Sequence, residues 1–211
     1  MADEAVEMCA RHGFRTLKVK GGQGFATDIE GIRAIGRAVS DNIALYFDCN
    51  SACKPHEALD YARAVADEGA RMIEDPCPLV PDAAFAALRA QSPIPVQVDF
   101  GSWSLRDAKL FLGQGAQGLS AKAGRFGLSD CWLMQEAAEK AGSGGVAGLM
   151  GESALGTLAA LQFAAAVPAP MLPAELTWYL AMTEQVSTYV PAIVDGCVDL
   201  PQTPSLASLV D

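Results

Sequence analysis

Residues 16–48 read TLKVKGGQGFATDIEGIRAIGRAVSDNIALYFD and contain one complete strand–helix–strand unit. The run 16–20 alternates like a strand and is followed by a glycine-rich turn, and the apolar run 44–48 ends on a carboxylate. Between them, apolar residues recur at helical spacing over 28–39, which predicts an amphipathic helix. This order of elements is typical of a parallel βαβ unit.

The same unit repeats along the rest of the chain. We expect further strands at 71–74, 95–99, 118–122 and 146–150, with a weaker seventh strand near 171–176. Helices are expected at 55–70, 83–90, 105–113, 129–141 and 156–166. Such a repeat builds either an open doubly wound sheet or a (β/α) barrel.

Ionisable residues at the strand ends favour the barrel. Successive strand ends carry charges at spacings of 28, 26, 25, 23 and 30 residues, namely Lys20, Asp48, Glu74, Asp99, Lys122 and Glu152. In a barrel the carboxyl ends of all strands open onto one mouth, where active sites are assembled. We therefore predict an α/β fold, a TIM-like (β/α) barrel of about seven βα units. It occupies residues 1–190 and is followed by an irregular tail at 191–211.

The charge balance excludes several classes of partner. The 211 residues carry 15 Lys and Arg against 25 Asp and Glu, a net charge of −10, which argues against nucleic acid binding. No apolar run approaches the roughly 18 residues that span a bilayer, so we expect a cytoplasmic protein without a membrane partner. The six cysteines include no Cys-x-x-Cys pair, and we expect reduced thiols.

Three carboxylates at one mouth would repel one another without a cation. Asp48, Glu74 and Asp99 offer only oxygen ligands, which favour a hard ion, Mg²⁺ or Mn²⁺. Lys20 and Lys122 flank them in the strand order, and a lysine with a lowered pKa can serve as a general base. Taken singly, each carboxylate is more commonly a loop cap or a solvated charge, and a lone Lys-x-Lys is a common strand edge.

Six segments, in order, carry a resemblance to a known family. They are GFRTLKVKGG, YFDCNSACKPHEAL, MIEDPCP, IPVQVDFGSWSLRDA, GLSAKAGRFGLSD and GLMGESALGTLAAL, and the tail segment DGCVDLPQTPSL follows them. Together they resemble the barrel domain of the enolase superfamily, in the mandelate racemase and muconate lactonizing enzyme group. Neither His12 nor His56 fits a histidine–aspartate dyad, so Lys122 places the chain nearer the muconate lactonizing subgroup.

The resemblance implies a chemistry and a role for each residue. Mg²⁺ would bind a small carboxylate substrate and stabilise the enediolate formed when the α-proton is removed, leading to racemisation or epimerisation, cycloisomerisation, or dehydration. Lys20 and Lys122 would act as base and acid on opposite faces of the substrate, although some enzymes of this group use a single base. Further roles fall to Asp48, Glu74 and Asp99 as metal ligands, to Lys18 as added positive charge, to Glu152 as a carboxyl near the substrate, and to Asn50 as an amide behind the ligands.

The resemblance also bears on what surrounds the barrel. Members of the family carry an N-terminal capping domain, and we expect that domain and the first barrel strand to be absent from this chain. A barrel with unpaired edges invites pairing, so a homo-oligomer is expected. The alternative to the enzyme is a truncated, catalytically impaired barrel that acts as a structural or interaction module.

Overall fold

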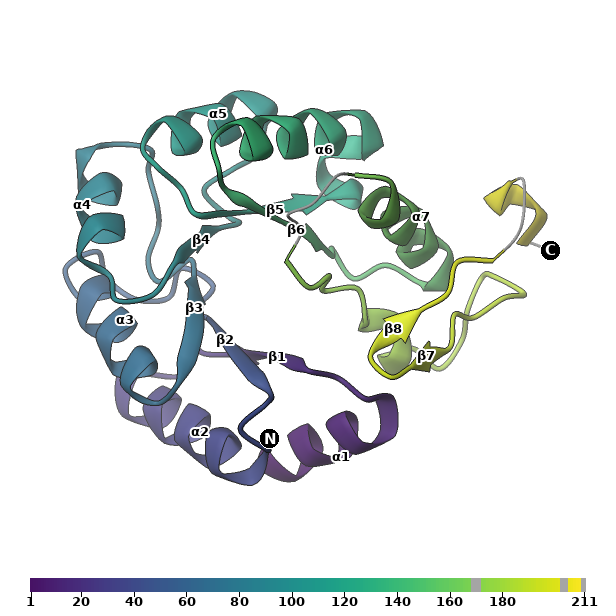
Figure 1. The fold of residues 1–211 in the computed structure, drawn as a ribbon, viewed down its shortest axis with the longest axis horizontal. Helices are drawn as coiled ribbons and strands as arrows, with labels where there is room; N and C mark the ends of the chain where they lie inside the picture. The colour runs from purple at the N-terminus through teal and green to yellow at the C-terminus, as the bar shows by residue number, and fades with distance from the viewer. Residues whose placement is uncertain (168–171, 202–204, 210–211) are drawn as a thin grey trace.

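The computed structural model describes residues 1–167, 172–201 and 205–209. Six parallel strands lie side by side in chain order and curl into part of a barrel, with helices on the outside (Figure 1). The strands are β1 Thr16–Lys20, β2 Ala44–Asp48, β3 Ala70–Glu74, β4 Val96–Val98, β5 Gly118–Lys122 and β6 Gly144–Gly148. The helices are α1 Ala2–His12, α2 Phe25–Ala38, α3 Ala58–Asp67, α4 Ala83–Gln91, α5 Leu105–Gly113, α6 Ala123–Lys140 and α7 Ala154–Ala166. The predicted (β/α) barrel architecture is confirmed.

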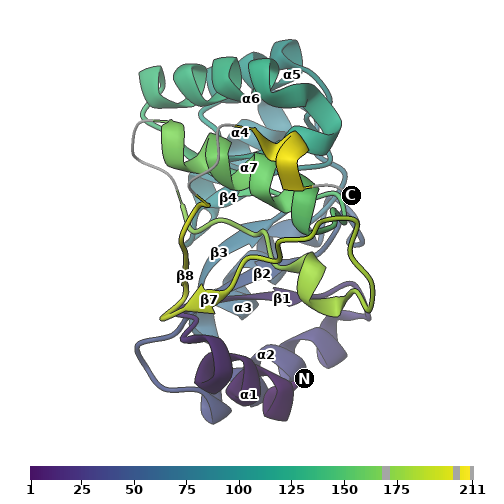
Figure 2. The same ribbon diagram turned by 90° about the vertical axis from the view of Figure 1, so that its right-hand side faces the viewer.

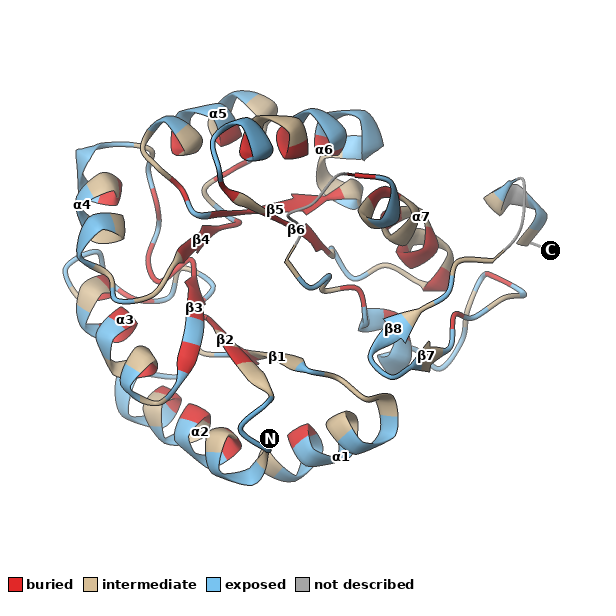
Figure 3. Cartoon of the chain, in the orientation of Figure 1, coloured by how far each residue is buried: buried red, intermediate tan, exposed pale blue. Residues whose placement is uncertain are grey.

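The two faces of the curled sheet differ in polarity. Alternate residues of a strand point to opposite sides of a sheet, so Ile73 joins the core under the helices while Glu74 points to the other side. Helix residues such as Ile32, Val65 and Phe111 are fully buried in the same core. Figure 3 shows the burial concentrated on the strands and on the inner faces of the helices.

The seventh strand differs from the prediction. Met171 lies outside the described residues, and 172–176 is an extended segment that is not part of the sheet. It lies beside β6 through two hydrogen bonds, from the Leu172 amide to the Gly145 carbonyl at 2.8 Å and from the Glu175 amide to the Ala147 carbonyl at 2.9 Å. The two donors are three residues apart but the two acceptors only two, so the segment does not keep the regular register of a strand.

The tail contains more regular structure than expected. A short hairpin of β7 Ile193–Val194 and β8 Cys197–Val198 turns at Asp195 and Gly196, both with positive φ, and lies beside the end of α1 (Figure 2). Asp-Gly is a strong turn signal for a tight hairpin, and it outweighs the surrounding prolines. Two 3₁₀ turns, η1 Trp178–Ala181 and η2 Leu206–Leu209, complete the described elements.

The helix expected over 129–141 begins earlier, at Ala123, and bends at Gly127, whose φ of 74° is not helical.

In the described part of the chain, no helix is long and apolar enough to cross a membrane. All six cysteines are free thiols, as expected.

The hairpin rests on a glycine that ends α1, and this contact predicts a measurable stability effect. A Cβ on Gly13 would lie 2.7 Å from the Asp195 Cα, whereas one on Gly142, which has nearly the same φ, would meet nothing. We expect Gly142→Ala to cost only the left-handed penalty of about 1–2 kcal/mol. Gly13→Ala should cost about 1–3 kcal/mol more through the clash. Urea denaturation of both variants measures the difference, and equal losses would contradict the packing of the hairpin.

Candidate metal centre and active site

The register of the sheet brings the predicted residues to one level. Lys20 pairs with Asp48, and Asp48 with Glu74, so three consecutive strand ends stand side by side. Glu74 pairs in turn with Gln97 on β4. Because the strands are parallel and in register, their charged ends meet on the inside of the curl.

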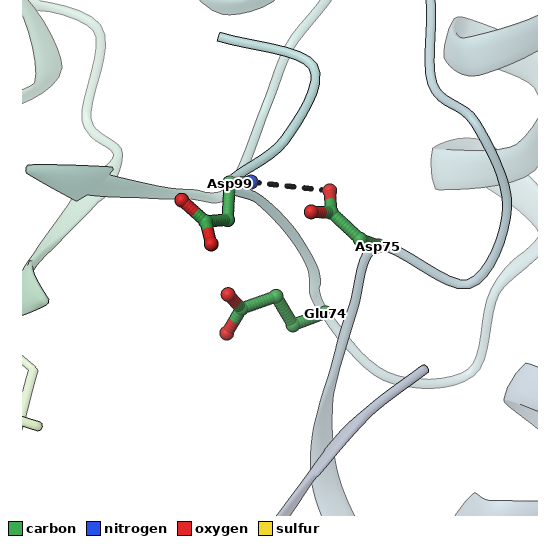
Figure 4. A group of neighbouring side chains, drawn as sticks. All are labelled: Glu74, Asp75 and Asp99. Carbon is green, nitrogen blue, oxygen red and sulfur yellow. Dashed lines mark hydrogen bonds between the residues drawn. The ribbon is translucent and has the colours of Figure 1, made fainter. Parts of the chain in front are cut away.

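A compact carboxylate group forms there. Glu74, Asp75 and Asp99 are buried, and each offers an oxygen within 4.8 Å of the others (Figure 4). The prediction had Asp48 as the third member in place of Asp75. Asp75 instead accepts hydrogen bonds from the backbone amides of Asp99, at 3.1 Å, and Phe100, at 2.6 Å. It thereby holds the turn that carries Asp99.

Asp48 lies beside this group and forms ion pairs with two lysines. Its carboxylate accepts a hydrogen bond from the Lys20 ammonium at 2.5 Å. The ammonium of Lys18 lies 3.5 Å from the same carboxylate. The Asn50 backbone amide, at 2.8 Å, and its side-chain amide, at 3.0 Å, also donate to it. Burial alone would raise the pKa of Asp48, but Lys18 and Lys20 outweigh it and hold that pKa below its usual value. Asn50 therefore contacts Asp48 through both its backbone and its side chain.

Nearby cations compensate the burial of Glu74 and Asp75 less fully. Burial raises the pKa of Glu74 well above its usual value despite an ion pair with Lys18, and it raises the pKa of Asp75 to about 7. The Gln97 side chain donates to Glu74 Oε2 at 2.8 Å, while Glu74 Oε1 is buried with no partner in the described structure. An unpartnered carboxylate oxygen among all-oxygen donors fits a hard divalent cation.

Lys18 is the most heavily paired cation of the site. It contacts Asp48 and Glu74, and it donates to Glu175 at 2.6 Å from across the opening between β1 and the 172–176 segment. Burial would lower the pKa of Lys18, but these carboxylates raise it. Lys18 therefore stays charged beside these carboxylates. Sequence reasoning missed Glu175, because its segment carried only a weak strand signal.

Asp99 is held between two cations. The Lys122 ammonium lies 2.5 Å from one carboxylate oxygen, and Arg125 donates to the other at 2.9 Å. Arg125 also donates to the carbonyls of Asp99 and Ser102, its side chain is 3% exposed, and it stacks on Trp103 at 4.6 Å. Sequence reasoning missed it as a site residue, although it lies three residues after Lys122 in the segment GLSAKAGRFGLSD.

Lys20, Lys122 and Glu152 differ in how they relate to the carboxylates. Lys20 is 61% exposed at its side chain and Lys122 only 11%, so the two amines occupy different surroundings. Glu152 accepts the Met150 backbone amide at 2.7 Å. Within the described residues, no hydrogen bond or ion pair joins Glu152 to the other predicted site residues.

The placement of Arg125 predicts a loss of metal affinity when it is removed. Arg125→Met should weaken Mg²⁺ binding about 10–100-fold, the usual effect of losing a residue that orients a metal ligand. Arg125→Lys should retain part of the affinity, because it keeps the charge but not the forked donor. Calorimetry compares both with Arg106→Met, an exposed control. Equal affinities in Arg125→Met and the control would contradict this role.

Comparison with known proteins agrees with the architecture. The model of the enolase C-terminal domain-like family matches residues 1–207. Muconate cycloisomerase 1 of Pseudomonas putida is 28% identical over 211 residues, covering 99% of this chain and 56% of the relative. L-Ala-D/L-Glu epimerase of Thermotoga maritima is 30% identical over 155 residues, which cover 72% of this chain and 45% of the relative. The chain thus spans about half the length of the curated relatives it matches.

Solved structures give the same result. Muconate cycloisomerase from Pseudomonas fluorescens superposes with a TM-score of 0.90 at 27% identity, over 97% of this chain and 58% of that one. The L-Ala-D/L-Glu epimerase from Bacillus subtilis superposes with a TM-score of 0.88 at 27% identity, over 97% of this chain and 58% of that one. With strand order, strand-end carboxylates and family model in agreement, this chain belongs to the enolase C-terminal domain-like family.

Proposed function

We propose that this barrel removes the proton α to a carboxylate of a small organic acid with the help of bound Mg²⁺ or Mn²⁺. Racemisation or epimerisation, cycloisomerisation and dehydration all begin with this step. The observation that carries the proposal is the buried carboxylate group beside two lysines on strands four apart in the ring. Relatives named as cycloisomerases and epimerases support the same reaction class.

Each residue of the site has a distinct task in this proposal. Asp48, Glu74 and Asp99 would hold the cation, which supplies positive charge to the substrate carboxylate when bound. Arg125 and Gln97 fix the orientation of Asp99 and Glu74. Lys18, paired with three carboxylates, keeps its charge and offsets theirs.

The proton is moved by the two remaining lysines. Lys20 ends β1 and lies 2.5 Å from Asp48, whereas Lys122 ends β5 and lies 2.5 Å from Asp99. In this proposal the two amines face opposite sides of the substrate. The neutral amine of one would take the α-proton, and the charged form of the other would return it. Glu152, at the end of the segment after β6, would contact the substrate beyond the metal.

The wider setting is part of the proposal. Residues 1–190 would form the catalytic barrel in the cytoplasm, and 191–211 its tail. The 172–176 segment lies along β6, whereas β1 ends the strand order at the other side of the described sheet, so a second copy pairing with β1 would give a homo-oligomer. Sedimentation analysis tests this: we expect a dimer or larger species, and a monomer at all concentrations would contradict it.

The experiment that tests the function is solvent exchange. The protein is incubated in D₂O with Mg²⁺ and a library of small carboxylic acids, and deuterium at the α-carbon is measured by mass spectrometry. We expect Mg²⁺-dependent incorporation into at least one acid. Tight Mg²⁺ binding without exchange into any acid would favour the alternative, an impaired barrel that acts as a structural or interaction module.

A further inference from the structure

Exposed apolar side chains border Lys122 and Arg125. Phe100 directly follows the proposed ligand Asp99, and it is 40% exposed. Its ring centre lies 5.8 Å from Lys122 Nζ and 5.9 Å from the Arg125 guanidinium. Its backbone is fixed, because its amide donates a hydrogen bond to Asp75 at 2.6 Å. An aromatic ring is therefore held beside one of the two proposed proton carriers, with part of its surface open to solvent.

Two further apolar side chains contact Arg125, and each is more exposed than Phe100. The ring centre of Trp103 lies 4.6 Å from the Arg125 guanidinium. The Met150 sulfur accepts a hydrogen bond from the same guanidinium at 3.8 Å. Arg125 is itself buried, so it anchors the three side chains while their outer surfaces stay open.

The loop after β6 extends this surface. A Cβ added to Gly124, two residues after Lys122, would lie 3.3 Å from the Met150 Cβ, so the loop packs closely on the start of α6. A Cβ added to Gly151 would lie 3.6 Å from the indole nitrogen of Trp178, which is exposed as well. Four exposed side chains thus form what we call the apolar rim: Phe100, Trp103, Met150 and Trp178.

The residues that follow Lys20 differ in character. Glycines occupy positions 21, 22 and 24, and Gln23 lies between them. Phe25, the next residue, packs edge-on against Tyr61 of α3, with the ring centres 4.8 Å apart. A substrate bound between the two lysines therefore meets small and polar groups after Lys20 and an aromatic ring beside Lys122.

The charges beside the apolar rim are already engaged. Lys122 and Arg125 are both paired with Asp99, at 2.5 Å and 2.9 Å. The neighbouring carboxylate, Glu152, accepts a hydrogen bond from the Met150 amide at 2.7 Å. A second anionic group on a substrate would meet Glu152 and two cations that Asp99 already binds. An apolar group needs no such partner and gains free energy by leaving water.

We propose that the acid recognised at this site carries an aromatic or other bulky apolar group on its α-carbon, and that this group lies against Phe100 of the apolar rim. The inference rests on the proposed function, in which Lys122 exchanges a proton with the α-carbon. An α-carbon in reacting position lies about 3–3.5 Å from the lysine nitrogen. The ring of Phe100 is 5.8 Å from that nitrogen, so a group of benzyl size spans the remaining gap.

Three α-hydroxy acids test the proposal, because they differ only in the group attached to the α-carbon. Phenyllactate carries a benzyl group, lactate a methyl group, and malate a second carboxylate on a methylene. Calorimetry of the full chain with saturating Mg²⁺ measures their dissociation constants, and α-deuteration in D₂O measures exchange. We expect phenyllactate to bind about 10-fold or more tightly than either of the others, the scale of burying one aromatic group.

Substitutions within the apolar rim separate a specific contact from nonspecific adsorption. Phe100→Ala should weaken phenyllactate binding about 10-fold and leave lactate binding unchanged, whereas Phe100→Leu should retain most of the preference. Met150→Ala should cause a smaller loss. Trp132→Ala, which removes an exposed ring from α6, is the control and should change nothing. Calorimetry with Mg²⁺ alone checks that each variant keeps its metal affinity.

The outcomes distinguish this inference from the proposed function. Equal affinities for the three acids, tightest binding of malate, or no detectable binding of any of them would overturn the inference and leave the apolar rim as a packing surface for another protein segment. Persistence of the full preference in Phe100→Ala would overturn it as well. Exchange without preference would overturn this inference alone. Preferential binding of phenyllactate without exchange into any acid would support the recognition of apolar acids and contradict the proposed function.

Discussion

Glu74→Gln should reduce Mg²⁺ affinity by roughly 100-fold or more, because the substitution removes the charge of a proposed ligand and even residues behind a ligand cost 10–100-fold. Glu74 combines burial, a raised pKa and a carboxylate oxygen without a described partner, so it gains most from a cation. Calorimetry measures the affinity, and circular dichroism confirms that the variant is folded. Glu136→Gln, on the exposed side of α6, is the matched control.

The companion substitutions separate the predicted ligand set from the observed carboxylate group. Asp99→Asn and Asp48→Asn should also weaken Mg²⁺ binding strongly. Asp75→Asn should mainly lower the unfolding midpoint, because Asp75 binds the backbone of the Asp99 turn. Unchanged affinity in both Glu74→Gln and Asp48→Asn would show that the metal site has been misassigned.

Replacing either proposed proton carrier should slow α-proton exchange by about 10²–10⁴-fold, the usual contribution of a general acid or base. Lys20→Met and Lys122→Met should differ in kind, because the two amines lie on different strands and pair with different carboxylates, Asp48 and Asp99. Each variant should lose exchange with one enantiomer and keep it with the other. The assay is α-deuteration of each separate enantiomer in D₂O.

Lys109→Met, on the exposed face of α5, serves as the control for the loss of a lysine. Loss of both enantiomers in one lysine variant and of neither in the other would indicate one-base chemistry. If both Lys20→Met and Lys122→Met kept exchange of both enantiomers, the two-lysine mechanism would be wrong.

The parts of the fold that the sequence predicts well are those with a local cause. The bounds of β1, β2, β5 and α5 coincide with the prediction, because each is a periodic run bounded by a turn or a charge. The charges at strand ends could be predicted to converge, because parallel register places equivalent positions side by side. Gln97, two residues before Asp99, also shares that face, a signal available from the alternation of β4 alone.

Other parts depend on the third dimension. Arg125 reaches Asp99 from the first turn of α6, just before the bend at Gly127. Glu175 meets Lys18 across the opening of the ring, 157 positions apart in the chain. Asp75 differs from its neighbour Glu74 only in that its left-handed backbone turns it toward the Asp99 loop. No periodicity in the sequence encodes these contacts.

The central claim is that the buried carboxylates at the strand ends form a divalent metal centre. Anomalous diffraction from crystals grown with Mn²⁺ tests it most directly, because the signal locates the ion without assuming its ligands. The account predicts an anomalous peak at the carboxylates of Glu74 and Asp99, lost in crystals of Glu74→Gln. No peak there at a Mn²⁺ concentration that saturates calorimetric binding, or a peak confined to surface carboxylates, would contradict it.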